Sequence, residues 1–241
     1  MNTYFLLLCH GKSLEILEER IGEFASLNNI VWGSMSTFDI PQKYILDKIG
    51  CHFTVVYDSS TVKNANDYEL IVRIPRLINY LTQNKINKYI CTKTDKHNLF
   101  DLRNRLKPTF NEDFKNQIVY AEDLNIIPQD FKVSLHLYIA CLIKLGYKNI
   151  ILFGADGGGK YGNSIESYYK WEEVKKDKEV ADNLSYNMVG DSNNINSTYE
   201  WLMNKNIGYV PEILNCSPDS VYTVFKKITY DECLEHLKNN L

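Results

Sequence analysis

The sequence predicts an α/β protein: a single Rossmann-like domain built on a mostly parallel central sheet. Short apolar runs alternate with segments of helical period along most of the 241 residues, and such alternation is typical of βαβ units. The apolar run at 149–153 leads directly into a glycine-rich turn at 154–159. The segment before it, 131–145, is apolar nearly all round, which indicates a strand covered on both faces. We therefore expect one domain over 1–241, with 160–194 as a helical and loop lid after the glycine-rich turn.

The elements follow from these periodicities in chain order. Ser13 is placed to begin the first helix, because Leu14, Leu17, Ile21 and Phe24 recur at helical spacing after it. Gly146 is placed to end the helix at 131–145. Strands are expected at 4–8, 30–32, 53–57, 88–91, 118–120, 149–153, 209–210 and 213–215. Further helices are expected at 42–49, 68–82, 97–106, 169–182, 196–205, 220–226 and 230–239.

Composition excludes several classes of partner. A net charge of −3, with scattered lysines, argues against a nucleic-acid-binding protein. The six cysteines form no CxxC pair, so we expect reduced thiols in a cytoplasmic protein and no metal site. The first apolar run is too short for a signal peptide, and no stretch reaches the length of a membrane span. Peripheral membrane association and homo-oligomerisation stay open.

The glycine-rich turn has the spacing of a P-loop but lacks two of its features. Gly154 and Gly159 are five residues apart and Lys160 follows, as in that motif. However, Tyr161 stands where a P-loop needs Ser or Thr to hold magnesium, and 161–164 is typical of a loop rather than a helix start. We therefore expect a ligand-binding turn of another kind.

Polar or glycine residues follow each of four predicted strands. Because parallel strands end at the same edge of a sheet, these residues should gather there, where open α/β sheets bind nucleotides. The amino terminus of the first helix would offer free N–H groups to an anion. The alternatives are that Ser13 is only an N-cap and that Asp58 and Ser59 only form a turn. The residues at these strand ends are His10, Gly11 and Ser13, then Ser36, then Asp58 and Ser59, and finally Gly154 and Asp156.

Four blocks of sequence resemble a known family. The stretch Leu-Leu-Cys-His-Gly-Lys-Ser-Leu at 7–14 resembles the G-N-G-P-S-L opening of bacterial sialyltransferases of glycosyltransferase family 42 and of the motility-accessory and MptE-like group (DUF115). Residues 145–156, Leu-Gly-Tyr-Lys-Asn-Ile running into Phe-Gly-Ala-Asp, are similar to the G-Y-K-x-I strand and S-G-x-D turn of the family. Residues 190–193 and 215–220 resemble its G-H-S loop and C-P-N-S turn.

The resemblance implies a site for a cytidine monophosphate donor. By position it implies binding roles for Gly11, Ser13, Asp58, Ser134, Gly154, Ser217, Asp219 and Ser220. His10, Ser36, Ser59 and Asp156 complete the candidate nucleotide-binding set, because they lie on the same loops. For Asp156, a contact to the ligand and a loop-capping role are both open. His136, on the helix beside Ser134, is interpreted as a core histidine.

The resemblance also implies a catalytic set. Tyrosines of the family donate hydrogen bonds to the departing phosphate in place of a metal, and the candidates in this chain are Tyr161, Tyr168 and Tyr169. Asp191 stands where the family has its histidine base, and a carboxylate can deprotonate an acceptor hydroxyl within hydrogen-bond reach. The alternative is that Asp191 only closes a turn or caps the helix after it.

The function expected from these observations is glycosyl transfer. A sugar, sialic-acid-like or other, would pass from a CMP-linked donor to a glycan or protein acceptor, with no cofactor required. One alternative is an MptE-like pyrophosphokinase that uses ATP and Mg²⁺, since Gly190 and Asp191 keep part of its H-G-D-N signature. The other is a catalytically silent nucleotide-binding module.

Overall fold

The computed structural model describes residues 3–9, 11, 13–35, 45, 48–49, 53–56, 86–91, 118–127, 134–156, 209, 211–220 and 222–241. The expected lid at 160–194 lies outside these residues, as do the helices expected at 68–82, 97–106, 169–182 and 196–205.

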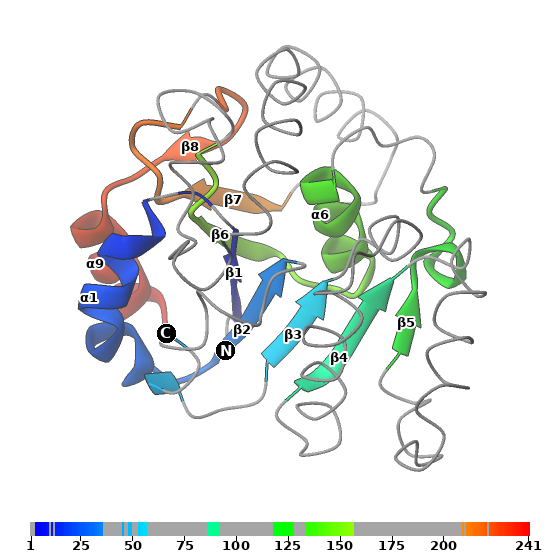
Figure 1. The fold of residues 1–241 in the computed structure, drawn as a ribbon, viewed down its shortest axis with the longest axis horizontal. Coiled ribbons are helices and arrows are strands. Elements are labelled where there is room, and N and C mark those ends of the chain that lie inside the picture. Colours follow the sequence, from blue (N-terminus) through cyan, green and yellow to red (C-terminus); the bar gives the residue numbers. More distant parts are fainter. Residues whose placement is uncertain are drawn as a thin grey trace, which may run out of the picture.

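The described residues form an eight-stranded sheet in the order β5-β4-β3-β2-β1-β6-β7-β8 (Figure 1). Every one of its neighbouring pairs is parallel. This confirms the α/β prediction of a parallel central sheet. The strands are β1 (Tyr4–Leu8), β2 (Ile30–Met35), β3 (Phe53–Val56), β4 (Ile86–Cys91), β5 (Ile118–Tyr120), β6 (Asn149–Phe153), β7 (Glu212–Asn215) and β8 (Lys226–Lys227).

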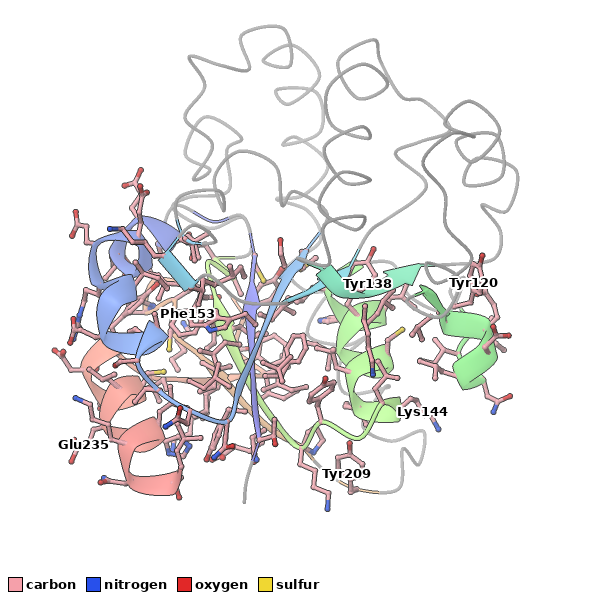
Figure 2. The ribbon with its side chains drawn as sticks, turned by 90° about the horizontal axis from the view of Figure 1, so that it is seen from below. Tyr120, Tyr138, Lys144, Phe153, Tyr209 and Glu235 are labelled. Atoms are coloured by element: carbon pink, nitrogen blue, oxygen red, sulfur yellow. The ribbon has the colours of Figure 1, made fainter. Side chains whose placement is uncertain are left out.

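Helices cover the sheet on both sides. Helices α1 (Leu14–Ala25) and α9 (Tyr230–Asn240) lie side by side on one face, and α6 (Ser134–Lys144) lies on the other, with the short helix η5 (Ala121–Leu124) next to β5 (Figure 1). Phe153 of β6 lies on the side of α1 and α9, where its ring meets Phe24 edge-on at 5.5 Å between centroids (Figure 2).

Side chains of the central strands point alternately to the two faces of the sheet, so the core has two halves. In β1, Tyr4, Leu6 and Leu8 pack toward α1 and α9, whereas Phe5 and Leu7 pack toward α6. All five are buried, because successive side chains of a strand point to opposite faces and both faces are covered.

The strand order places a topological switch point between β1 and β6. The chain moves outward from β1 through β2, β3, β4 and β5, and then returns to pair β6 with the other side of β1. Ligands of open parallel sheets bind at such a point, outside the carboxyl ends of the strands.

Three expectations for local structure are wrong. Strand β2 continues to Met35, which pairs with Val56 of β3, so Ser34 lies inside a strand rather than in the turn after it. Residues 222–226 form no helix: the Ser220 hydroxyl accepts the N–H of Tyr222, and such local bonds compete with helix formation. Tyr209 lies in a bend rather than a strand.

Candidate functional site

Hydrogen bonding between β1 and β6 continues beyond the ends of both strands. The N–H of Cys9 donates to the carbonyl of Phe153 at 2.8 Å, and that of Gly11 to the carbonyl of Gly154 at 2.7 Å. A Cβ on Gly11 would lie 2.3 Å from the Asp156 carboxyl and 2.6 Å from the Gly154 carbonyl oxygen. Gly154 itself has a φ of +69°. Two glycines thus let the loops approach each other closely at the switch point.

Asp156 links three strand ends. Its Oδ2 accepts the backbone N–H of Ser13 at 3.0 Å, and its Oδ1 accepts the Ser13 hydroxyl at 2.5 Å. The Oγ atoms of Ser13 and Ser217 lie 3.0 Å apart. The side chains that follow β1, β6 and β7 are therefore joined in one polar cluster, which we call the switch-point cluster: Ser13, Asp156 and Ser217. Asp156 is 3% exposed and Ser217 is fully buried.

The turn after β7 is fixed by a second set of bonds. The carbonyl of Ala155 accepts from the amide of Asn215 at 3.2 Å and from the Ser220 hydroxyl at 2.7 Å. Asn215 Oδ1 in turn accepts the N–H of Ser217 at 3.0 Å. Lys227 Nζ donates to the Ser220 carbonyl at 2.5 Å. This turn is held to the loop after β6 before any ligand binds.

The hydroxyl and thiol groups around the cluster are held neutral. Burial, followed by the negative charge of Asp156, raises the pKa of Cys9. Burial is also the main cause of the raised pKa of Tyr222 and of Tyr230, with smaller contributions from neighbouring thiols and from Asp156. Tyr230 consequently stays a donor, and its hydroxyl donates to the Ser13 carbonyl at 3.0 Å.

The structure joins six of the expected site residues at one edge. Gly11, Ser13, Gly154, Asp156, Ser217 and Ser220 share this edge through the bonds given above. Asp219 is exposed on the same turn, and Ser134 is the first residue of α6. The other candidates lie outside the described residues, and their roles stay predictions: His10, Ser36, Asp58, Ser59, Tyr161, Tyr168, Tyr169 and Asp191.

Two details differ from the sequence interpretation. Ser13 occupies the N-cap position of α1, but its hydroxyl makes no capping bond to the helix and instead donates to Asp156. The amino terminus of α1 was expected to offer free N–H groups to an anion, but the N–H of Ser13 is bonded to the Asp156 carboxylate. Of the two roles left open for Asp156, the loop-capping one is therefore present in the structure.

Sequence reasoning missed three residues of this edge: Asn215, Tyr230 and Lys227. Asn215 could have been found, because an amide that ends an apolar strand needs a polar partner once it is buried. Tyr230 and Lys227 gave no such signal, since both bind backbone carbonyls: Tyr230 that of Ser13, 217 positions away, and Lys227 that of Ser220, seven positions away.

His136 lies outside the cluster, in the core between α6 and the sheet. It is fully buried, and its ring meets that of Phe225 edge-on at 6.4 Å between centroids. Burial lowers its pKa to about 4, so the imidazole is neutral at physiological pH. The placement agrees with the interpretation as a core histidine.

No family model matches the sequence, and no curated protein does. Among solved structures the chain is similar to the sialyltransferase CstII from Campylobacter jejuni, described as in complex with a substrate analogue, cytidine-5′-monophosphate. The identity is 16%, the match covers 94% of this chain and 84% of that one, and the TM-score is 0.46. The fold described above rests on strand order and register rather than on this likeness.

Within the described part of the chain, no helix is long and apolar enough to cross a bilayer. Over the same residues, no group of three or more His, Cys, Asp or Glu side chains is arranged to hold a metal ion.

Proposed function

We propose that this protein is a glycosyltransferase-like enzyme that binds a CMP-linked sugar donor and transfers the sugar to a glycan or protein acceptor. The observation that carries the proposal is the switch-point cluster. It joins the ends of β1, β6 and β7 at the place where open parallel sheets bind nucleotides. The loops that meet there are the ones whose motifs resemble glycosyltransferase family 42.

The chemistry assigned to this site is displacement at the anomeric carbon. An acceptor oxygen bonds to that carbon as the bond to the donor phosphate breaks, and the acceptor proton passes to a base. In this proposal Asp191 is the base, and Tyr161, Tyr168 and Tyr169 donate hydrogen bonds to the departing phosphate. A phenolic donor can stabilise developing negative charge without a cation, so the reaction needs no cofactor.

The proposal is tested by thermal unfolding with a panel of nucleotides: CMP, CDP, UMP, UDP, and ATP with Mg²⁺. A ligand at one hundred times its dissociation constant adds about 2.7 kcal/mol to the free energy of unfolding. We expect cytidine nucleotides to give the largest stabilisation. A clear preference for ATP with Mg²⁺ would identify the pyrophosphokinase instead, and a lack of response to every nucleotide would overturn nucleotide binding itself.

A further inference from the structure

The direction of the hydrogen bonds in the switch-point cluster follows from counting protons. Ser13 Oγ lies 2.5 Å from Asp156 Oδ1 and 3.0 Å from Ser217 Oγ, but a hydroxyl carries only one proton. An ionised carboxylate can only accept, so the proton of Ser13 goes to Asp156. The contact with Ser217 must then be donated by Ser217. The three side chains form a directed relay from Ser217 to Ser13 to Asp156.

The amino terminus of α1 is already occupied by the same carboxylate. The N–H of Ser13 donates to Asp156 Oδ2 at 3.0 Å. The N–H of Leu14 donates to the Gly11 carbonyl at 3.1 Å, and that of Ile16 to the Ser13 carbonyl at 3.2 Å. The positive end of the dipole of this 12-residue helix therefore faces a negative charge of the protein itself. Asp156 is nearly fully buried there.

We propose that Asp156 is a built-in anion that takes the place of a ligand phosphate at the amino terminus of α1, and that this corner excludes phosphate and accepts hydrogen-bond donors. The half-buried Ser13 hydroxyl donates its one hydrogen bond to Asp156, so towards any other group it can only accept. A phosphate would meet a carboxylate of like charge, whereas a hydroxyl of a sugar would find acceptors. That the ligand group is a sugar hydroxyl rests on the proposed function. That Asp156 occupies the amino terminus of α1 does not.

Removing the carboxylate should create an anion site that the protein lacks. In Asp156→Ala, two donors of Ser13 and the end of the helix dipole face an empty space. We expect a lower melting temperature in chloride, and a recovery of about 2 °C or more when formate or inorganic phosphate replaces chloride at equal ionic strength. The affinity of Asp156→Ala for inorganic phosphate should rise about tenfold or more over wild type. Wild-type protein should show no recovery of melting temperature with formate or phosphate, and its affinity for phosphate should stay low.

Asp231→Ala is the matched control. It also removes a carboxylate that serves α1, through a 2.7 Å ion pair with Arg20, but that carboxylate is 84% exposed and leaves no enclosed space. Its stability should not respond to formate. If Asp156→Ala does not fold in chloride, the yields of folded protein in formate and in chloride are compared instead. A higher yield in formate supports the proposal. Equal responses to formate in wild type, Asp156→Ala and Asp231→Ala would overturn the proposal. Because no nucleotide is added, that result is independent of the proposed function.

Discussion

Gly11 shows how a single side-chain atom controls the switch point. Its backbone pairs with Gly154 while the Asp156 carboxyl occupies the space beside its Cα. A methyl group there would meet the carboxyl at 2.3 Å and the Gly154 carbonyl oxygen at 2.6 Å, so the loops after β1 and β6 would have to separate.

We therefore expect Gly11→Ala to lower the free energy of unfolding by about 1–3 kcal/mol or more, measured by urea denaturation. Gly22→Ala is the matched control: Gly22 lies within α1, and a Cβ there meets nothing within 4 Å. It should stabilise the protein by about 0.5–1 kcal/mol, because alanine favours the helix. Equal effects of the two substitutions would contradict the close approach at Gly11.

His136 makes the stability depend on pH. Its pKa is lowered by burial from 6.5 to about 4, so between these values the unfolded chain binds a proton that the folded chain does not. The contribution of the neutral, buried imidazole to the free energy of unfolding is fully present above pH 6.5. It is lost as the pH falls toward 4, at up to about 1.4 kcal/mol per pH unit. In His136→Leu the fall between pH 6.5 and 5 should be shallower. Denaturant titrations at several pH values test this, and an unchanged slope would rule out His136 as its source.

At the scale of elements, helix α9 is fixed at its start by a reciprocal pair of bonds. The N–H of Glu232 donates to the Thr229 hydroxyl at 3.2 Å, and the N–H of Thr229 donates to the Glu232 carboxylate at 2.7 Å. We expect Thr229→Ala to cost about 1 kcal/mol of unfolding free energy in urea denaturation. Glu235→Ala, an exposed site on the same helix, should be close to neutral.

The same pair predicts a dependence on acid. The bonds from the Thr229 backbone and hydroxyl lower the pKa of Glu232 below 4.5. Its contribution to stability is therefore present above pH 4.5 and lost as the pH falls through the lowered value. Glu232→Gln should lose part of this acid sensitivity, which is read from urea midpoints between pH 5 and 3. Identical curves for Glu232→Gln and wild type would contradict the capping box.

The elements that the sequence predicts correctly are those with a strong period of their own. Strands β1, β5 and β6 and helix α9 were expected within a residue of their observed bounds, because apolar runs or helical spacing define them locally. Strand β2 was expected to end at Trp32, since a glycine and a serine follow; pairing with β3 extends it to Met35. A helix was expected at 220–226, but the hydroxyl of Ser220 binds the N–H of Tyr222 and the Ala155 carbonyl. In the first case strand pairing overrides local preference; in the second, a local bond and a long-range bond of the Ser220 hydroxyl compete with the helix.

For the whole molecule, topology explains why the candidate site could be predicted only in part. Parallel strands end at one edge, so a sequence that predicts strands 4–8, 149–153 and 213–215 also predicts that the residues after them meet. The sequence could not show that Asp156 fills the terminus of α1, since that depends on two loops 143 positions apart approaching within 3.0 Å. The direction of the hydrogen bonds from Ser217 to Ser13 to Asp156 could not be predicted either, because it follows from the distances between their side-chain oxygens.

The two-sided core also makes the thiols reporters of global unfolding. Cys9 and Cys141 lie on the α6 side of the sheet, and Cys216 and Cys233 lie on the α1 and α9 side; all four are free and buried. Burial is the main cause of the raised pKa of Cys9, of Cys216 and of Cys141, the last to about 12. Thiolate is the reactive form, so alkylation must await exposure of the core.

Under native conditions we expect iodoacetamide to modify these four thiols slowly and at rates within about threefold of one another, because one cooperative opening exposes both sides of the sheet. Mass spectrometry of peptides after timed alkylation measures each rate, and protein unfolded in urea supplies the intrinsic reactivity. Destabilisation by Gly11→Ala should raise all four rates together. A rate more than about tenfold faster at Cys216 and Cys233 than at Cys9 and Cys141 would instead show that α9 and the end of β7 open separately from the rest of the sheet.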